Sequence, residues 1–288
     1  MKKAGGFGNS LAFSYFCTKN TPMKRQIPVY AVVLAITLLL MSCSQRQPQH
    51  VFTDEVRLPM TPVKNQGESE LCWAYAMLAT IETEHLQMGD SVNLSAVYIG
   101  RKLRDYQQSR GYNGDSQRAM GQTLLNMLPT IGIMDYDVLS DDAPDDLPTP
   151  QWVFMLGARY SPQEFAHSIC APDEYVGLTC WPDSPYYKKV EVPIPDNWEH
   201  NRLLNVPLDT LRQRVDHALR NGHPVCWESR GHAMAIMGLA RDERGKPYYL
   251  MKNSWGPDGP HGGIIYMSRR KMWKDMVALY MTRAAFDR

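Results

Sequence analysis

A run of apolar residues that begins at a cysteine constrains the fold of this chain more than any other feature. From Leu71 to Ile81 the sequence reads LCWAYAMLATI, and no polar face recurs along it at helical spacing. The run predicts a helix that is buried on nearly all sides, with Cys72 at its amino terminus. Ser69 is placed to cap this helix.

The position of Cys72 favours a reactive thiolate. The amino terminus of a helix exposes unpaired amides and the positive end of the macrodipole, and both lower the pKa of a thiol. Gln66 lies six residues upstream in a polar, glycine-containing loop. From there its side-chain amide can join the Cys72 amide in binding a developing oxyanion. A cysteine near apolar residues is more often a small core residue than a nucleophile, so the neighbouring signals decide the interpretation of Cys72.

The overall composition limits the classes of partner. Lys and Arg number 31 and Asp and Glu number 30, so there is no electrostatic reason to expect a nucleic-acid partner. Hydrophobic residues make up 44% of the chain, enough for a globular core. His217 and His223 lack carboxylate or cysteine partners at ligand spacing, so we expect no metal site and no cofactor.

The amino-terminal residues read as an export signal. A positively charged pair precedes the apolar segment 27–41, which is short for a transmembrane span. The sequence LMSC that ends at Cys43 resembles the lipobox of bacterial lipoproteins, which predicts a lipid on Cys43 and a bacterial cell-envelope location. An uncleaved signal anchor is the alternative. We assign 1–43 to an extension and signal peptide and 44–60 to a tether, and whether residues 1–22 are translated stays open.

The rest of the chain divides into a helical part and a strand-rich part. Helical patterns occupy 94–108, 119–132 and 207–222, and strand-like pieces occupy 224–229, 232–240, 247–255 and 263–268. We therefore predict one domain over 61–288, with a helical lobe over about 61–150 and a β-rich lobe over about 151–288. A site to which both lobes contribute residues would lie in the cleft between them.

Two segments resemble those that carry catalysis in papain-like cysteine peptidases. PVKNQGESELCWAYA is similar to the family's nucleophile segment, and GHAMAIMGLARDERGKPYYLMKNSWG is similar to its histidine and asparagine segments. Gln66, Cys72, His232 and Asn253 follow in the family's order, and the 160 residues between Cys72 and His232 are close to the ~130–150 typical of the papain group. The resemblance implies an α+β papain-like fold of two lobes.

A narrower resemblance is to the bleomycin hydrolase and aminopeptidase C branch. It rests on the segments 160–179, 190–198 and 207–229 and covers most of 61–282. The chain is shorter than those enzymes before 160, so the insertions that build their hexamer are expected to be missing, and the oligomeric state stays open. Only five residues follow Arg283, about 15 Å if extended. Because the resembling enzymes use a longer tail to close the cleft, we expect relaxed aminopeptidase selectivity.

The resemblance also implies roles for single residues. Cys72 would attack the peptide carbonyl as a thiolate paired with His232 and form a thioester, while Gln66 binds the oxyanion. Asn253 would orient His232, and Trp255 would shield that hydrogen bond. Trp73 and Gly114 are the further residues expected at the substrate, although the second glycine of the family's substrate loop is Asp115 here.

Two other functions fit the same residues. One is a peptide-binding envelope lipoprotein without turnover, although none of the four catalytic-type residues is missing. The other is an amidase or acyl transferase that acts on a non-peptide substrate. Cys170 and Cys180 are compatible with a disulfide or with free thiols, and Cys226 is expected to be a buried core thiol.

Overall fold

The computed structural model describes residues 51–155 and 157–287. By its contacts the chain divides into residues 1–49 and 50–288, and all described residues belong to the second unit. The predictions for the signal peptide, for Cys43 and for the start of the tether therefore lie outside the described residues. None of the helices within the described ranges is long and apolar enough to cross a membrane.

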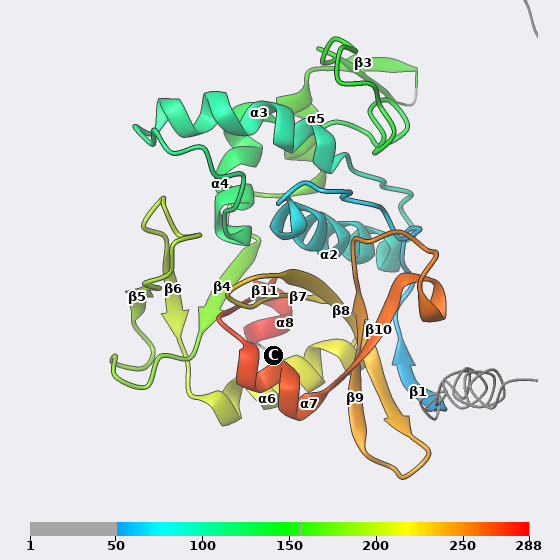
Figure 1. Cartoon of the computed structure of the whole chain (residues 1–288), viewed down its shortest axis with the longest axis vertical. Helices are drawn as coiled ribbons and strands as arrows, with labels where there is room; N and C mark the ends of the chain where they lie inside the picture. Colours follow the sequence, from blue (N-terminus) through cyan, green and yellow to red (C-terminus); the bar gives the residue numbers. More distant parts are fainter. Residues whose placement is uncertain (1–50, 156, 288) are drawn as a thin grey trace, which may run out of the picture. The chain divides into compact units, whose positions relative to one another are not determined.

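The described residues mix helices with one large sheet, so the predicted α+β class is confirmed (Figure 1). The helices are α2 (Cys72–Met88), α3 (Ala96–Ser109), α4 (Gly121–Ile131), α5 (Pro162–Ile169), α6 (Leu208–Arg220), α7 (Arg269–Asp275) and α8 (Arg283–Asp287), with a 3-10 turn η1 (Pro260–Gly263). The strands are β1 (Phe52–Arg57), β2 (Val153–Met155), β3 (Ala158–Tyr160), β4 (Tyr175–Thr179), β5 (Lys189–Glu191), β6 (Arg202–Asn205), β7 (Val225–Glu228), β8 (Ala233–Asp242), β9 (Pro247–Lys252), β10 (Ile264–Ser268) and β11 (Ala278–Thr282).

The apolar run forms α2, as predicted, and every residue from Cys72 to His85 is buried. The helix ends at Gly89, whose φ of 90° is readily adopted only by glycine. The predicted N-cap is wrong. The cap position is Leu71, without a side-chain hydrogen bond, because Ser69 closes a turn of its own: its hydroxyl donates to the Gln66 carbonyl at 2.7 Å.

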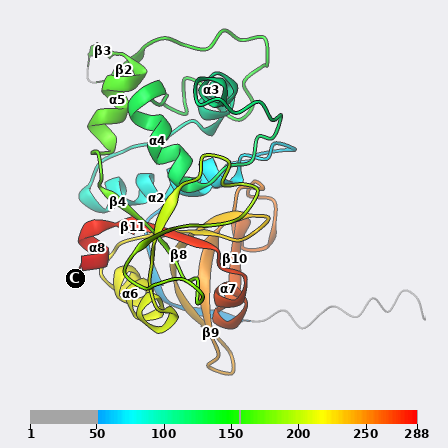
Figure 2. The same ribbon diagram turned by 90° about the vertical axis from the view of Figure 1, so that its left-hand side faces the viewer.

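Helices α3, α4 and α5 pack around α2 and share one apolar core with it (Figures 1 and 2). The Ser95 hydroxyl caps α3 by accepting from the Tyr98 amide at 3.1 Å. Helix α4 continues past Pro129 to Ile131, with Gly132 as its C-cap, in agreement with the predicted end. Helix α5 follows residue 150 in sequence and packs on α4, so the helical layer includes residues from beyond the predicted lobe division.

The large sheet has the strand order β10-β9-β8-β7-β11-β4-β6-β5, and β1 pairs with β8. Strand β8 pairs with β9 along one edge, and its other edge pairs first with β7 and then with β1. Helix α2 lies against β8 and β7, so the start of α2 faces the start of β8. This packing brings residues that are 160 positions apart to one place in the fold.

A second core lies between the sheet and α6. The predicted stripe of α6 is buried through Leu211, Val215 and Leu219, while Leu208 is only partly covered. Residues 283–287 follow β11, and the length of about 15 Å given from the sequence was the upper limit of the reach of residues 284–288. The segment 283–287 forms α8, in which Ala285 is buried beside α6 and the guanidinium of Arg214 lies 5.6 Å from the ring of Phe286.

Candidate active site

Cys72 and His232 line one pocket between α2 and the sheet. The pocket is narrow, with a volume of ≈ 10 Å³, which is room for about one water-sized group. Its other walls are Glu70, Trp73, Arg118, Ala119, Met120, Ile194, Asp196, Glu228, Ser229 and Ala233. The structure therefore brings together the predicted nucleophile and the predicted base, which are 160 positions apart in the sequence.

His232 is fixed by the predicted asparagine. Its Nε2 lies 2.7 Å from Oδ1 of Asn253, so Nε2 carries the hydrogen and Nδ1 is left for a proton acceptor role. The ring of Trp255 stacks on His232 with a centroid distance of 4.9 Å, although the indole itself is 61% exposed. Ser229 holds the backbone of His232, since its amide donates to the His232 carbonyl at 2.9 Å. The imidazole is thus held by Asn253 and Trp255, and Ser229 positions the backbone that carries it.

Gln66 joins the loop before α2 to the segment after Asn253. Its backbone amide donates to the Ser254 carbonyl at 2.7 Å, and its Oε1 accepts from the Ser254 hydroxyl at 2.6 Å. Its Nε2 donates to the Ser69 carbonyl at 2.6 Å, which leaves one N–H of the amide for a ligand. The predicted oxyanion role needs only that one donor and stays a prediction.

Burial changes the pKa of both members of the pair. Burial raises the pKa of the Cys72 thiol, although the Ala233 amide, the charge of Arg118 and the Trp73 amide oppose this change. Burial lowers the pKa of His232, against the Asn253 hydrogen bond. Both directions favour a neutral thiol and a neutral imidazole. Burial therefore acts against the thiolate expected from the helix terminus, and the ion pair of Cys72 and His232 stays a prediction.

Three charged residues at the pocket were not anticipated from the sequence. Arg118 donates from Nε and Nη2 to the two carboxylate oxygens of Asp196, at 2.9 and 2.8 Å. Glu228, on β7, accepts from the Gly121 amide at 2.5 Å and from the Tyr280 hydroxyl at 3.1 Å. Burial raises the pKa of Glu228 to about 8. Asp196 and Glu228 lie in the segments 190–198 and 207–229, on which the narrower family resemblance rests. That resemblance was the signal by which the sequence could have pointed to them.

The two predicted substrate contacts have different surroundings. Trp73 lines the pocket but is only 2% exposed, and its indole Nε1 donates to the Gln117 carbonyl at 2.9 Å. It therefore acts as a wall of the pocket and offers little surface to a ligand. Gly114 does not line this pocket, and its carbonyl accepts from Arg104 at 2.5 Å. Its contact with a substrate stays a prediction.

A buried charged cluster lies directly behind Asn253. Glu82 of α2 accepts from Lys64 and from the Leu94 amide, and Lys252 of β9 lies 3.8 Å from its second oxygen. Burial lowers the pKa of Lys252 to about 8. Because Lys252 directly precedes Asn253, the cluster ties the strand that holds Asn253 to the helix that begins at Cys72.

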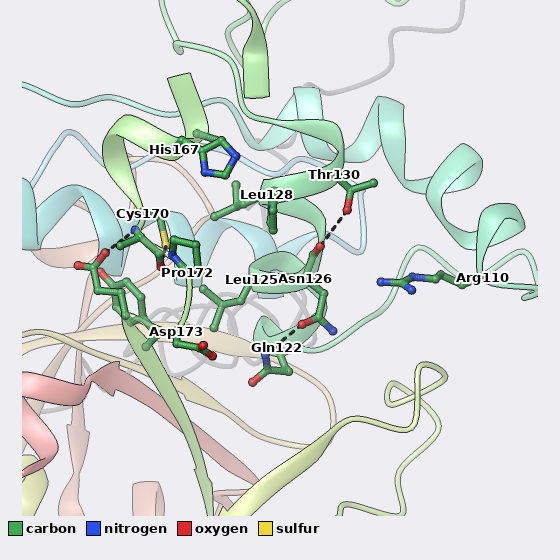
Figure 3. Close-up of a pocket in the computed structure, with 15 residues that line it drawn as sticks. Arg110, Gln122, Leu125, Asn126, Leu128, Thr130, His167, Cys170, Pro172 and Asp173 are labelled. Carbon is green, nitrogen blue, oxygen red and sulfur yellow. Dashed lines mark hydrogen bonds between the residues drawn. The ribbon is translucent and has the colours of Figure 1, made fainter. Parts of the chain in front are cut away.

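A larger pocket of ≈ 380 Å³ lies elsewhere, between α4 and the end of α5 (Figure 3). It contains Cys170 and His167, but burial raises the pKa of Cys170 to about 12. The Cys170 thiol contacts only the Ala171 carbonyl, at 3.8 Å, among the hydrogen bonds of the described residues. This pocket therefore lacks an activated nucleophile.

The described cysteines are all free thiols. Cys170 and Cys180 are both free thiols, so the structure has no disulfide between them, and Cys226 is a buried core thiol as predicted. Within the ranges that the structure describes, no group of three or more His, Cys, Asp or Glu side chains is placed to hold a metal ion.

Comparison with known proteins relates the chain to papain-type enzymes. Residues 216–283 match the family described as papain family cysteine protease. Ananain from Ananas comosus is 25% identical over 218 residues, and papaya proteinase 4 from Carica papaya is 24% identical over 221 residues. Each match covers 73% of this chain and 53% of the relative, so the chain spans about half the length of these curated relatives.

Solved structures agree with the fold. PepW from Lactobacillus rhamnosis HN001 superimposes with a TM-score of 0.59 at 16% identity, covering 90% of each chain. At this identity the likeness concerns the fold alone. Together with the matched papain segment it confirms the predicted papain-like α+β fold, whereas the bleomycin hydrolase and aminopeptidase C branch stays a proposal.

Proposed function

We propose that this chain is a papain-type cysteine peptidase that hydrolyses peptide bonds through Cys72 and His232. The observation that carries the proposal is the 2.7 Å hydrogen bond from His232 Nε2 to Asn253, in a pocket that also contains the thiol of Cys72. Two comparisons support the same chemistry. Residues 216–283 match the papain family cysteine protease model, and one relative is named papaya proteinase 4.

The proposed steps begin from the neutral pair that burial favours. Substrate entry would let His232 take the thiol proton through Nδ1 as the sulfur of Cys72 attacks the carbonyl carbon. The carbonyl oxygen then carries the negative charge, which the free N–H of Gln66 would stabilise. His232 returns the proton to the leaving amine, and the C–N bond breaks to give a thioester. Water, deprotonated by His232, releases the acid and restores the thiol.

The peptidase branch is a further part of the proposal. The segment 190–198, which resembles the bleomycin hydrolase and aminopeptidase C branch, supplies Ile194 and Asp196 to the pocket. The fold likeness to PepW is compatible with that branch. Amino-terminal and internal peptide bonds are both candidate substrates. The enzyme would act in the bacterial envelope, anchored by lipid on Cys43.

The test uses the purified chain with a peptide library and two reporters, one with a free amine and one acetylated. Cys72→Ala should lower the rate of hydrolysis by at least about 10⁴-fold, because no other group in the pocket can form the acyl-enzyme. Cys170→Ala removes a free thiol elsewhere and is the matched control. Peptide binding without hydrolysis by the wild type would favour the non-catalytic lipoprotein, and turnover of non-peptide amides alone would favour the amidase or acyl transferase.

A further inference from the structure

A wide hollow of ≈ 660 Å³ is lined by residues of α6, β9 and α7, three elements that are labelled in Figure 1. Its lining consists of Leu208, Arg212, Tyr249, Arg269, Arg270, Trp273 and Lys274. It shares no residue with the pocket of Cys72 and His232. Whatever it binds is therefore separate from the proposed peptidase site.

All charged side chains that line this hollow are positive. Four of its seven lining residues are cationic, and none is acidic. The chain as a whole is nearly neutral, with a formal charge of +1, so the cluster is a local feature and not the result of a basic composition. Like charges gathered at a surface repel one another unless an anion accompanies them.

Two of the cations are held in place by carboxylates and aromatic rings. Arg269 donates from Nη1 to Asp216 at 2.6 Å, and its guanidinium lies 5.0 Å from the ring centroid of Tyr249. Arg212 donates to Asp209 at 2.9 Å and lies 5.9 Å from the ring centroid of Trp273. The contacts of Arg269, which is the less exposed of the two, hold its guanidinium before any ligand arrives, and this reduces the entropy that binding would cost.

The other two cations, Arg270 and Lys274, form no ion pair with the described residues, and both are exposed. In addition, Nε of Arg269 is buried and has no hydrogen-bond partner among the described residues. Buried donors are usually paired in native structures, so this N–H is open to an acceptor.

We propose that this hollow is a binding site for a phosphate group. Planar guanidiniums match tetrahedral phosphate oxygens with paired hydrogen bonds. A phosphate monoester carries about −1.5 to −2 charges at neutral pH, which corresponds to the two unpaired cations, whereas one arginine suffices for a carboxylate. The aromatic walls are covered by the guanidiniums and are nearly inaccessible, with Tyr249 at 0% and Trp273 at 8% exposure, so recognition rests on charge.

The experiment measures binding to the full chain in a non-ionic detergent by isothermal titration calorimetry at low ionic strength. Inorganic phosphate is the first probe. Arg270→Glu with Lys274→Glu should weaken its affinity at least about tenfold, which corresponds to 1.4 kcal/mol. Lys188→Glu with Lys189→Glu makes the same change of net charge at an exposed site elsewhere and should leave the affinity within about twofold.

Two further probes identify the source of the phosphate. Glycerol 3-phosphate represents a soluble monoester, and glycerophosphoglycerol represents the diester headgroup of an anionic lipid. Competition by the monoester alone assigns a soluble ligand, and equal competition by the diester assigns a lipid headgroup. The charge-preserving pair Arg270→Lys with Lys274→Arg should retain binding and excludes an effect on folding. The absence of phosphate binding in the wild type, or equal weakening by the Lys188 and Lys189 changes, would overturn the proposal.

Discussion

Replacement of Glu228 by glutamine isolates one buried carboxyl at the floor of the proposed active site. In the fold its two oxygens accept from the Gly121 amide and the Tyr280 hydroxyl, and an amide side chain can keep both contacts with the tyrosine as acceptor. Burial raises its pKa from 4.5 to about 8. Glu228→Gln therefore imitates the protonated carboxyl and removes its ability to ionise.

The magnitude follows from linkage between protonation and folding. Between pH 4.5 and about 8 the folded protein holds a proton on Glu228 that the unfolded chain has lost, so the wild type loses stability as pH rises through this window. The loss approaches 1.4 kcal/mol per pH unit and totals about 5 kcal/mol. Below the window both states are protonated, and the effect vanishes. The glutamine variant cannot ionise at this position. Its free energy of unfolding, relative to that of the wild type, therefore increases with pH.

Urea unfolding at pH 5, 6, 7 and 8 measures this difference directly. We expect the free energy of unfolding of Glu228→Gln, relative to the wild type, to increase by about 3 kcal/mol between pH 5 and pH 7. Glu70→Gln changes an exposed carboxyl at the same pocket and is the matched control. A difference that stays constant across these pH values would show that Glu228 is ionised in the fold, and the reasoning from burial would then be refuted.

Two further predictions concern cysteines. The alkylation rate of Cys72 by iodoacetamide should rise about tenfold per pH unit between pH 6 and pH 8, because burial keeps the thiol protonated there; a rate that is already constant at pH 6, followed by mass spectrometry, would instead indicate a preformed thiolate. Cys43→Ser should move the protein from the detergent phase to the aqueous phase in a phase-separation assay, since a lipid on Cys43 is expected to supply the attachment. Wild-type protein found in the aqueous phase with a different first residue would contradict the lipid anchor.

Elements with a long, regular pattern were predictable from the sequence. Helix α6 has an apolar stripe at helical spacing and was expected close to its observed bounds. The apolar run from Leu71 to Ile81 predicted the start of α2, but the helix continues to Met88. The strands β7 to β10 follow from short apolar runs between turn residues. Helices α7 and α8, with 7 and 5 residues, are too short for periodicity to reveal them.

The polar framework of the candidate site was not predictable from periodicity. Arg118 and Asp196 are 78 residues apart, and neither lies in a regular pattern, so only the folded chain pairs them. The contact from Gln66 to Ser254 spans 188 residues in the same way. The order of Gln66, Cys72, His232 and Asn253 was recognisable only through a family resemblance, because four separated residues have no spacing rule of their own.

The protonation of Cys72 illustrates how one feature of the sequence has opposite effects. The apolar run makes α2 recognisable because it is buried, and the helix start supplies amides that favour a thiolate. The same burial leaves Cys72 only 8% exposed and raises its pKa beyond what those amides offset. Position in a helix is local and visible in the sequence, whereas desolvation depends on the packing of β8 and α2. We therefore expect activation of Cys72 to depend on His232 as well as on the helix start.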